Sequence, residues 1–409
     1  MIAFRSTLAA FGAAAVIAAT MAVAGPLASD EVDRNAIDAL DAVAGRALFE
    51  REWVGAPAST DAADGLGPLF NAKSCNGCHR GGGAAQFVEK NGRLIARGLA
   101  VRAASADGTP HPVLGTQVQN RALPGLEAEG RVSVRIVQGV LTVSTQTAHP
   151  AALFETRIAP SLRGRGLLDD IDADAVMALA DPDDRDGDGI SGRARFVTDS
   201  NGHRALGRFG QKAGAASLIE QTAHAAALDM GLSSPRVRSP FGDCTASQVA
   251  CLSRATGQSS LTEGEELSGD MLALITGYLR TLDAPEADLA SKGARLFAET
   301  GCAACHRPRM PARGGGSVTV FSDLLLHDMG DESGSVIREG DVLPAEWRTA
   351  PLRDLASRNG IRRYLHDGAT PSIADAIVRH GGEAAQARRA FEGLDGRDRQ
   401  LLLDFVSKL

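Results

Sequence analysis

Aromatic side chains are scarce in this sequence of 409 residues: phenylalanine, tyrosine and tryptophan make up 4% of it, with two Trp and two Tyr. Such rings normally fill much of a domain core, so we expect a buried cofactor to supply part of the missing bulk. Basic charge is also lacking, because the formal net charge is −7. This charge gives no general field for phosphate backbones and argues against nucleic acid as a partner.

Long apolar runs are absent from the sequence beyond its N-terminus. Residues 8–23 form an Ala-rich apolar stretch after Arg5, and Ala22-Val23-Ala24 has the small-residue pattern of a cleavage site. The stretch is shorter than the ~20 residues of a spanning helix, and it predicts a signal peptide over residues 1–24. We therefore expect an exported, soluble, periplasmic protein with no membrane span after cleavage. A retained N-terminal anchor is the alternative.

Cysteine is also infrequent, with six residues that fall into three pairs. The pairs are Cys75/Cys78, Cys244/Cys251 and Cys302/Cys305. In an oxidising compartment each pair is a candidate disulfide. For Cys244 and Cys251 we predict a structural disulfide, with a catalytic dithiol as the alternative.

In the other two pairs a histidine follows at once: Cys75-Asn-Gly-Cys78-His79 and Cys302-Ala-Ala-Cys305-His306. This is the attachment pattern of c-type haem. The two cysteines add to the vinyl groups of one porphyrin, and the histidine ligates its iron. A thioredoxin-like dithiol or a shared zinc site are the alternatives, but neither requires that histidine in both copies. We predict two covalently bound c-type haems with His79 and His306 as iron ligands.

The surroundings of the two pentapeptides repeat, because Leu69-Phe70 and Leu296-Phe297 precede the first cysteine by the same offset. We expect a mainly α fold with two cytochrome c-like helical haem domains, over residues 25–129 and 261–409. The insertion between them, residues 130–260, is expected to be mixed and to contain a few short strands.

Local patterns indicate individual elements. Residues 130–145 alternate apolar and polar side chains and predict a strand or hairpin. Thr262 and Glu265 form a capping box that predicts a helix running to about Leu282. Residues 287–299 are predicted to form the helix that leads into the second haem site, and residues 383–409 to form two helices.

Several longer segments, taken with the two pentapeptides, resemble one known family. They are residues 184–193, 206–210, 321–330, 346–349, 364–368 and 380–383. The sequence resembles the di-haem c-type oxidoreductases, often labelled thiol oxidoreductases, over nearly all of the mature chain. That family is related to bacterial cytochrome c peroxidases and to the di-haem enzyme that matures tryptophan tryptophylquinone.

The resemblance implies a peroxidase-like oxidoreductase. It would take electrons from a small donor protein, a cytochrome or a cupredoxin, and reduce peroxide. A di-haem electron carrier without peroxidase activity and a di-haem enzyme that oxidises a protein substrate are the alternatives.

The resemblance also implies a distal ligand for the second haem. In the peroxidase relatives this ligand follows the histidine of a Tyr-x-His-x-Gly turn by fourteen residues, and from His366 this count reaches His380. The relatives have methionine or tyrosine there, so His380 would make the second haem bis-histidine. A helix-capping role is the alternative for His380. Further candidates near this haem are His327, Met329, Met310 and His366.

Over the first haem the relatives carry a glutamine and a glutamate ten residues apart, a spacing that Gln119 and Glu129 match. Peroxide cleavage needs a group that takes a proton from one oxygen and returns it to the other. A buried carboxylate with a raised pKa can do this, and an amide can orient the peroxide. The resemblance therefore implies that Glu129 and Gln119 are catalytic, with Glu127 as a competitor and surface positions as the alternative.

The sequence departs from the relatives in two places. Ile95 stands where some of them carry a displaceable histidine, so the first haem is five-coordinate or is ligated by His111 or His149. No tryptophan lies just upstream of Gln119, and Trp347 and Trp53 are the available substitutes.

An acidic loop raises a further cofactor. Asp184, Asp186 and Asp188 alternate before Gly189, as in the first half of an EF-hand calcium loop. Arg195 replaces the glutamate expected at position twelve. Calcium and a tight aspartate-rich turn are both open interpretations.

Overall fold

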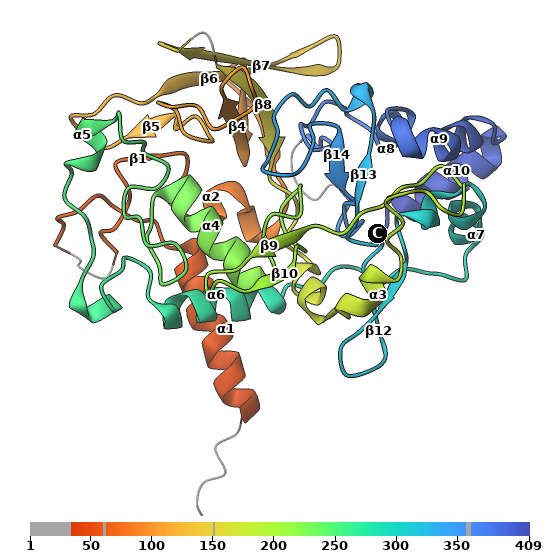
Figure 1. Ribbon diagram of the computed structural model, residues 1–409, viewed down its shortest axis with the longest axis horizontal. Helices are drawn as coiled ribbons and strands as arrows, with labels where there is room; N and C mark the ends of the chain where they lie inside the picture. Colours follow the sequence, from red (N-terminus) through yellow and green to blue (C-terminus); the bar gives the residue numbers. More distant parts are fainter. Residues whose placement is uncertain (1–33, 60–62, 150–151, 357–360) are drawn as a thin grey trace, which may run out of the picture. The chain divides into compact units, whose positions relative to one another are not determined.

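The computed structural model describes residues 34–59, 63–149, 152–356 and 361–409 (Figure 1). The predicted signal peptide, residues 1–24, lies outside the described residues. Contacts divide the chain into Met1–Ala39 and Leu40–Leu409, and all the candidate site residues belong to the second unit. Within the described ranges, no helix combines the length and the apolar character needed to cross a bilayer.

Ten α-helices occur in the described ranges, and four of them are shorter than two turns. They are α1 Arg34–Glu50, α2 Cys75–Cys78, α3 Ala173–Met177, α4 Leu218–Met230, α5 Val249–Leu252, α6 Gly269–Arg280, α7 Lys292–Glu299, α8 Ile373–Val378, α9 Ala385–Glu392 and α10 Gly396–Val406. The two helices expected over residues 383–409 are thereby confirmed as α9 and α10.

The described strands pair into small two-stranded antiparallel sheets: β1–β5, β2–β3, β4–β8, β6–β7, β9–β10, β11–β12 and β13–β14. Their bounds are β1 Leu69–Phe70, β2 Gln86–Lys90, β3 Arg93–Arg97, β4 Leu99–Ala104, β5 Arg121–Ala122, β6 Gly130–Val137, β7 Val140–Thr147, β8 Leu153–Ile158, β9 Phe196–Thr198, β10 Arg204–Leu206, β11 Arg309–Pro311, β12 Ser317–Thr319, β13 Leu326–Asp328 and β14 Glu346–Arg348.

The expectation of a mainly α fold is wrong. Of the described residues, 29% are helical and 22% are in strands, and strands occur on both sides of the predicted insertion. Many of them have only two or three residues, and such short strands leave no period of two for a sequence pattern to reveal. The predicted domain bounds at 129/130 and 260/261 stay predictions.

The hairpin expected over residues 130–145 is confirmed as β6 and β7, which pair from Gly130↔Thr147 to Val137↔Val140. Its turn residues, Gln138 and Gly139, have φ values of +51° and +81°. Two successive positive φ values are typical of the tight turns whose twist matches that of the flanking strands.

Two predicted helices begin later in the structure than in the sequence prediction. The capping box at Thr262 is wrong, because α6 begins at Gly269 with Ser268 as its N-cap. Glu263 and Gly264, which lie between Thr262 and Ser268, have φ values of +61° and +82°. A right-handed helix cannot continue through residues with positive φ. The helix that leads into the second cysteine pair is α7, and its N-cap is Ser291.

The two Leu-Phe pairs lie in different secondary structure. Leu69 and Phe70 form β1, whereas Leu296 and Phe297 lie in α7. Phe70 belongs to the larger hydrophobic core, which α4 and α6 share. Leu296 and Phe297 belong to a second core beside the C-terminal helices. Each cysteine pair is thus anchored to a core of its own.

The second core depends on a close helix crossing. A Cβ at Gly293 in α7 would lie 2.4 Å from the carbonyl oxygen of Leu401 in α10, so only glycine lets the two helices approach this far. The approach brings the ring of Phe297 to 5.7 Å from Phe405 and 5.9 Å from Phe321, both edge-on. Such aromatic contacts stabilise beyond area burial and fix the segment that leads to Cys302.

Candidate functional site: one cavity with two Cys-x-x-Cys-His motifs

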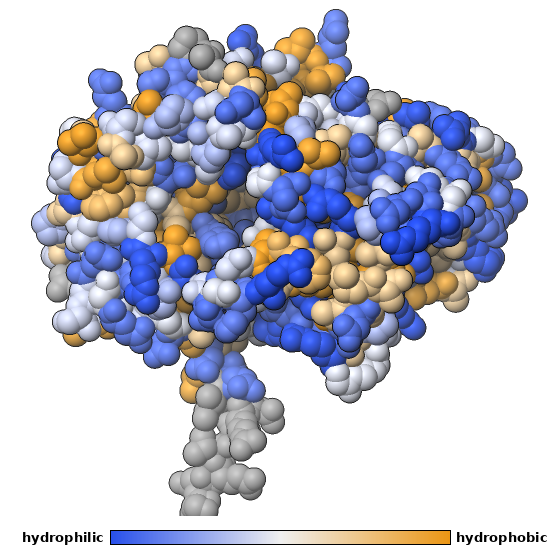
Figure 2. Space-filling model, viewed as in Figure 1, coloured by the Kyte–Doolittle hydropathy of each residue, from blue (hydrophilic) through white to orange (hydrophobic). Residues whose placement is uncertain are grey.

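One cavity of about 1780 Å³ is lined by all six residues of the two cysteine–histidine motifs and by His380. Its wall includes side chains from α2, α4, α6, α7, α8 and β14. The face of the molecule in Figure 2 is hollowed near its middle, where apolar residues lie deeper than their polar neighbours. The fold therefore brings the two motifs, far apart in sequence, to one shared cavity.

The first motif is set by a single helical turn. Ser74 caps α2 by accepting a hydrogen bond from Gly77 N at 3.1 Å, and His79 N donates to Cys75 O at 2.9 Å. The ring of His79 is within hydrogen-bond distance of Pro160 O through Nδ1, at 3.0 Å. A proton on Nδ1 leaves Nε2 as the free ligand atom, and burial lowers the pKa of His79 to about 4, so the ring is neutral.

The second motif repeats this arrangement. His306 N donates to Cys302 O at 3.0 Å, and Nδ1 of His306 lies 3.2 Å from Phe321 O. Burial again lowers the pKa of His306 to about 4. Both histidines therefore present a neutral imidazole with Nε2 available, the form that ligates a metal.

His380 faces His306, with the ring centroids 6.5 Å apart. It lies just after α8, where its Nδ1 is 2.8 Å from Ala376 O. This contact is the capping role considered as an alternative, and it orients the ring as well, because Nε2 is left free. The two readings of His380 are thus compatible.

Three of the four motif cysteines, Cys75, Cys78 and Cys302, do not have the electrostatics of a reactive thiol. Burial raises the pKa of Cys75 and of Cys78 to about 12, and it raises the pKa of Cys302. A redox dithiol needs a lowered pKa. Among the described residues, no potential metal-binding group combines the two cysteine pairs, so a shared zinc site has no support either. Half-buried thiols in the wall of a cavity that His79 and His306 also line fit porphyrin attachment.

The structure does not bring Gln119 and Glu129 to the cavity. The Gln119 side chain accepts from Asn71 Nδ2 at 2.9 Å and donates to Leu228 O at 3.0 Å. The Glu129 carboxylate accepts from Gln119 N and from Gln248 Nε2, both at 2.6 Å. Burial raises the pKa of Glu129 to about 7, but both side chains tie neighbouring segments together. Glu127 is exposed.

A different amide–carboxylate pair lines the cavity. Gln117 Nε2 donates to Asp229 Oδ1 at 2.7 Å, and both residues belong to the cavity wall. Asp229 lies near the end of α4, and its backbone oxygen accepts from Asn71 N and Ala72 N, close to the first motif. Burial raises the pKa of Asp229. Sequence reasoning missed this pair, although Gln117 is the other glutamine of the same short segment.

The structure also shows where the residues lie at which the sequence departs from the relatives. Ile95 lines the cavity, while His111 and His149 do not. These two rings instead lie 5.5 Å from one another. Trp53 is buried in the larger core. Neither histidine is therefore placed to ligate the first haem.

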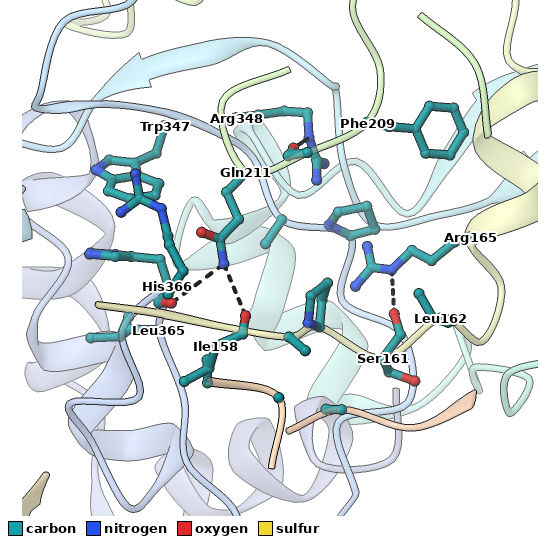
Figure 3. A pocket seen from close by; sticks show the side chains of 18 of the residues that line it. Ile158, Ser161, Leu162, Arg165, Phe209, Gln211, Trp347, Arg348, Leu365 and His366 are labelled. Carbon is teal, nitrogen blue, oxygen red and sulfur yellow. Dashed lines mark hydrogen bonds between the residues drawn. The ribbon is translucent and has the colours of Figure 1, made fainter. Parts of the chain in front are cut away.

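Trp347 lines the cavity and stacks on His366, with ring centroids 3.7 Å apart and planes at 23°. Its ring also lies 3.7 Å from Lys212 Nζ and 4.3 Å from the Arg157 guanidinium carbon. Figure 3 shows Gln211 fixing the His366 turn, because Gln211 Nε2 donates to His366 O at 3.4 Å and to Ile158 O at 3.2 Å. The stack forms a rigid part of the wall.

His327 is held by two carboxylates beside the second motif. Its Nδ1 lies 2.6 Å from a Glu383 oxygen and its Nε2 lies 3.0 Å from Asp323. Burial alone lowers the pKa of His327, but the hydrogen bonds to Asp323, Cys305 and Glu383 outweigh it and raise the pKa to about 12. Cys305 Sγ is 3.9 Å away. His327 is thus a fixed cation with both nitrogens engaged, not a ligand with a free one.

Two other predicted features lie outside the cavity motifs. The Cys244–Cys251 disulfide is confirmed. Ligand oxygens of Asp184, Asp186 and Asp188 lie within 4.8 Å of one another. The same carboxylates accept hydrogen bonds from backbone N–H groups of their own loop, as in an aspartate-rich turn. Calcium stays a prediction.

Two separate Cys-x-x-Cys-His motifs share one large cavity, an arrangement that fits the class of proteins with two haems. Residues 8–93 and 142–409 match the family described as "Di-haem oxidoreductase, putative peroxidase". The chain belongs to this di-haem oxidoreductase family. The stretch outside the match, residues 94–141, contains Gln117, Gln119 and Glu129.

Similarity beyond the family is weak. A structure of hydrazine synthase from Kuenenia stuttgartiensis pressurised with xenon has 20% sequence identity and a TM-score of 0.24. The alignment covers 36% of this chain and 57% of the other, so this chain spans little more than half the length of that neighbour. No curated protein is significantly similar to the chain.

Proposed function

We propose that this protein is an exported, periplasmic c-type di-haem peroxidase that receives electrons from a small cytochrome or cupredoxin. The observation that supports this best is the shared cavity. Inside it, His79 and His306 each follow a Cys-x-x-Cys pair and each present a free Nε2. Covalent attachment through the four motif cysteines accounts for their half-buried positions in the cavity wall and for the raised pKa of Cys75, Cys78 and Cys302.

The two haems would be held differently. His306 and His380 face one another and would bind one iron from both sides, which suits transfer and storage of an electron. His111 and His149 lie outside the cavity wall, so in this proposal neither of these two candidate ligands would fill the position at which the first haem would meet peroxide. When bound, the haems supply the electron storage and transfer that the two-electron reduction of peroxide requires.

Asp229 would move the proton. Its carboxylate is fixed through Oδ1 by Gln117, which leaves Oδ2 to take a proton from the near oxygen of peroxide and return it to the leaving oxygen. The raised pKa of Asp229 favours this exchange near neutral pH, because the carboxylate then takes up a proton more readily. Gln117 acts as the positioning residue.

The test uses the holoprotein made in cells that mature cytochromes c. The protein is reduced, mixed anaerobically with hydrogen peroxide and followed by its haem absorbance. We expect one equivalent of peroxide to reoxidise both haems and catalytic turnover to follow with a reduced small cytochrome. Two reducible haems that stay reduced in peroxide would contradict peroxidase activity and favour a pure electron carrier.

A further inference from the structure

Two arginines enter the cavity between the two motifs. Arg165 begins the short 3-10 helix Arg165–Asp170, and Arg348 ends β14. Both line the cavity, and Figure 3 shows their guanidinium groups reaching into the pocket near Phe209. They come from segments far apart in the chain, so the fold itself brings these two cations together.

The hydrogen bonds of these groups are incomplete. A guanidinium carries five N–H donors. Arg165 donates through Nε to Ser161 O at 2.9 Å. Arg348 donates through Nε to Gly210 O at 2.9 Å and through Nη1 to Thr349 O at 2.8 Å. Throughout the ranges that the structure describes, Nη1 and Nη2 of Arg165 and Nη2 of Arg348 make no hydrogen bond.

The local charge balance is positive. Burial, together with the nearby charges of Arg348 and Arg353, lowers the pKa of Arg165 to about 9. The Asp354 carboxylate opposes them, but it already accepts from Ser161 Oγ at 2.6 Å. Burial also lowers the pKa of Arg348 to about 10. Buried cations are costly unless an anion pairs with them.

The place of the two arginines points to the anion. The charge of Arg165 acts on His79, and the backbone of Ala350, two residues after Arg348, lies beside His306. The pair therefore stands between the two ligand histidines. Each haem carries two propionate carboxylates, and the planar fork of arginine matches a carboxylate through two parallel hydrogen bonds.

We propose that Arg165 and Arg348 bind propionate carboxylates of the two haems and so fix the facing edges of the porphyrins. Arg165 serves the haem at His79, and Arg348 serves the haem at His306. This inference rests on the haems of the proposed function, but it does not depend on peroxide as the substrate.

The test compares Arg165→Gln and Arg348→Gln in the holoprotein. Haem is first counted by pyridine haemochrome. The resonance Raman propionate-bending band and the two midpoint potentials are then measured. With both haems retained, we expect each variant to shift the band. We also expect it to weaken reduction of its own haem about tenfold, 59 mV for one electron, because a cation that stabilises the added electron is lost.

The matched control is Arg163→Gln. Arg163 lies two residues before Arg165 but outside the cavity wall, and it donates to Gly81 O at 3.0 Å. It should leave the band and the potentials unchanged. Arg165→Lys tests the fork without loss of charge: the potential is expected to stay and the band to shift. An equal shift in Arg163→Gln would overturn the proposal.

The anion can come from the haem or from solution, and acetate distinguishes these sources. We expect acetate to leave the band and the potentials of the wild type unchanged. A saturable effect of acetate, lost in Arg165→Gln, would assign the wall to a free carboxylate and overturn the proposal. A wild-type protein without haem would contradict the proposed function as well, whereas two haems with an unshifted band in both variants would contradict this inference alone.

Discussion

The rings of His306 and His380 face one another across the cavity with centroids 6.5 Å apart and planes at 56°. Their Nδ1 atoms are engaged by Phe321 O and Ala376 O, so the two Nε2 atoms are the ones available. A metal–imidazole bond is about 2 Å long, and this spacing accommodates one ion between the rings. The relationship supports a bis-histidine second haem.

The first prediction concerns that ligand pair. His380→Ala removes one axial ligand, so one low-spin ferric signal should become high-spin in electron paramagnetic resonance, with both haems still attached. His203→Ala is the control, because the His203 side chain is 78% exposed and lies outside the cavity wall. An unchanged low-spin signal in His380→Ala would remove His380 from the coordination sphere.

The second prediction separates the two carboxylate–amide pairs. Asp229→Asn abolishes proton exchange at the cavity wall and should lower peroxide turnover by at least ~10²-fold. Glu129→Gln is the matched control and should change turnover by less than about threefold, because Glu129 is engaged away from the cavity. Steady-state assays with a reduced cytochrome measure both. The reverse ranking would return the acid–base role to Glu129.

The third prediction is a pH dependence of stability that originates at His327. Its pKa rises from the usual value near 6.5 in the unfolded chain to about 12 in the folded one, through Asp323, Cys305 and Glu383 despite burial. The stabilisation is therefore complete below about pH 6.5 and declines between pH 6.5 and 12. The slope is roughly 1.4 kcal/mol per pH unit.

In the His327→Gln variant the free energy of unfolding should lack this dependence on pH. Urea unfolding at about pH 6 and about pH 9 should show the stability difference between wild type and His327→Gln shrinking by roughly 3 kcal/mol. A gap between wild type and His327→Gln that is the same at both pH values would mean that His327 is not a protonated clamp.

The fourth prediction concerns the disulfide. Cys244 and Cys251 are separated by seven positions. Closing a loop of this length lowers the entropy of the unfolded chain and so raises its free energy by about 2 kcal/mol. Replacing both by serine should lower the free energy of unfolding by about this amount and leave the haem spectra unchanged. Loss of a haem signal in this variant would show that the pair does more than stabilise the fold.

How much of the fold is predictable from the sequence depends on the length of each element. β6 and β7 are long enough to show alternation, and they were predictable. The start of α6 was not predictable, because positive φ values at Glu263 and Gly264 prevent a helix from beginning at Thr262. Strands such as β1 and β14 form through tertiary contacts that local patterns do not encode.

The same distinction holds for the site. The motifs ending in His79 and His306 are recognisable because the attachment of c-type haem requires this residue spacing. The pair Gln117 and Asp229 was not recognisable, because the two residues are distant in sequence and meet only when α4 packs near the first motif. The spacing found in the relatives pointed to Gln119. Its side chain lies outside the cavity wall and hydrogen-bonds to Asn71 and Leu228.

The central claim is that two haems are bound covalently in this one cavity, and intact mass measured after denaturation tests it most directly. Protein from cells competent in cytochrome c maturation should have the mass of the polypeptide plus two haems, with a matching pyridine haemochrome. Ser substitution of Cys75 and Cys78 should remove one haem. A mass equal to the bare polypeptide would contradict the account.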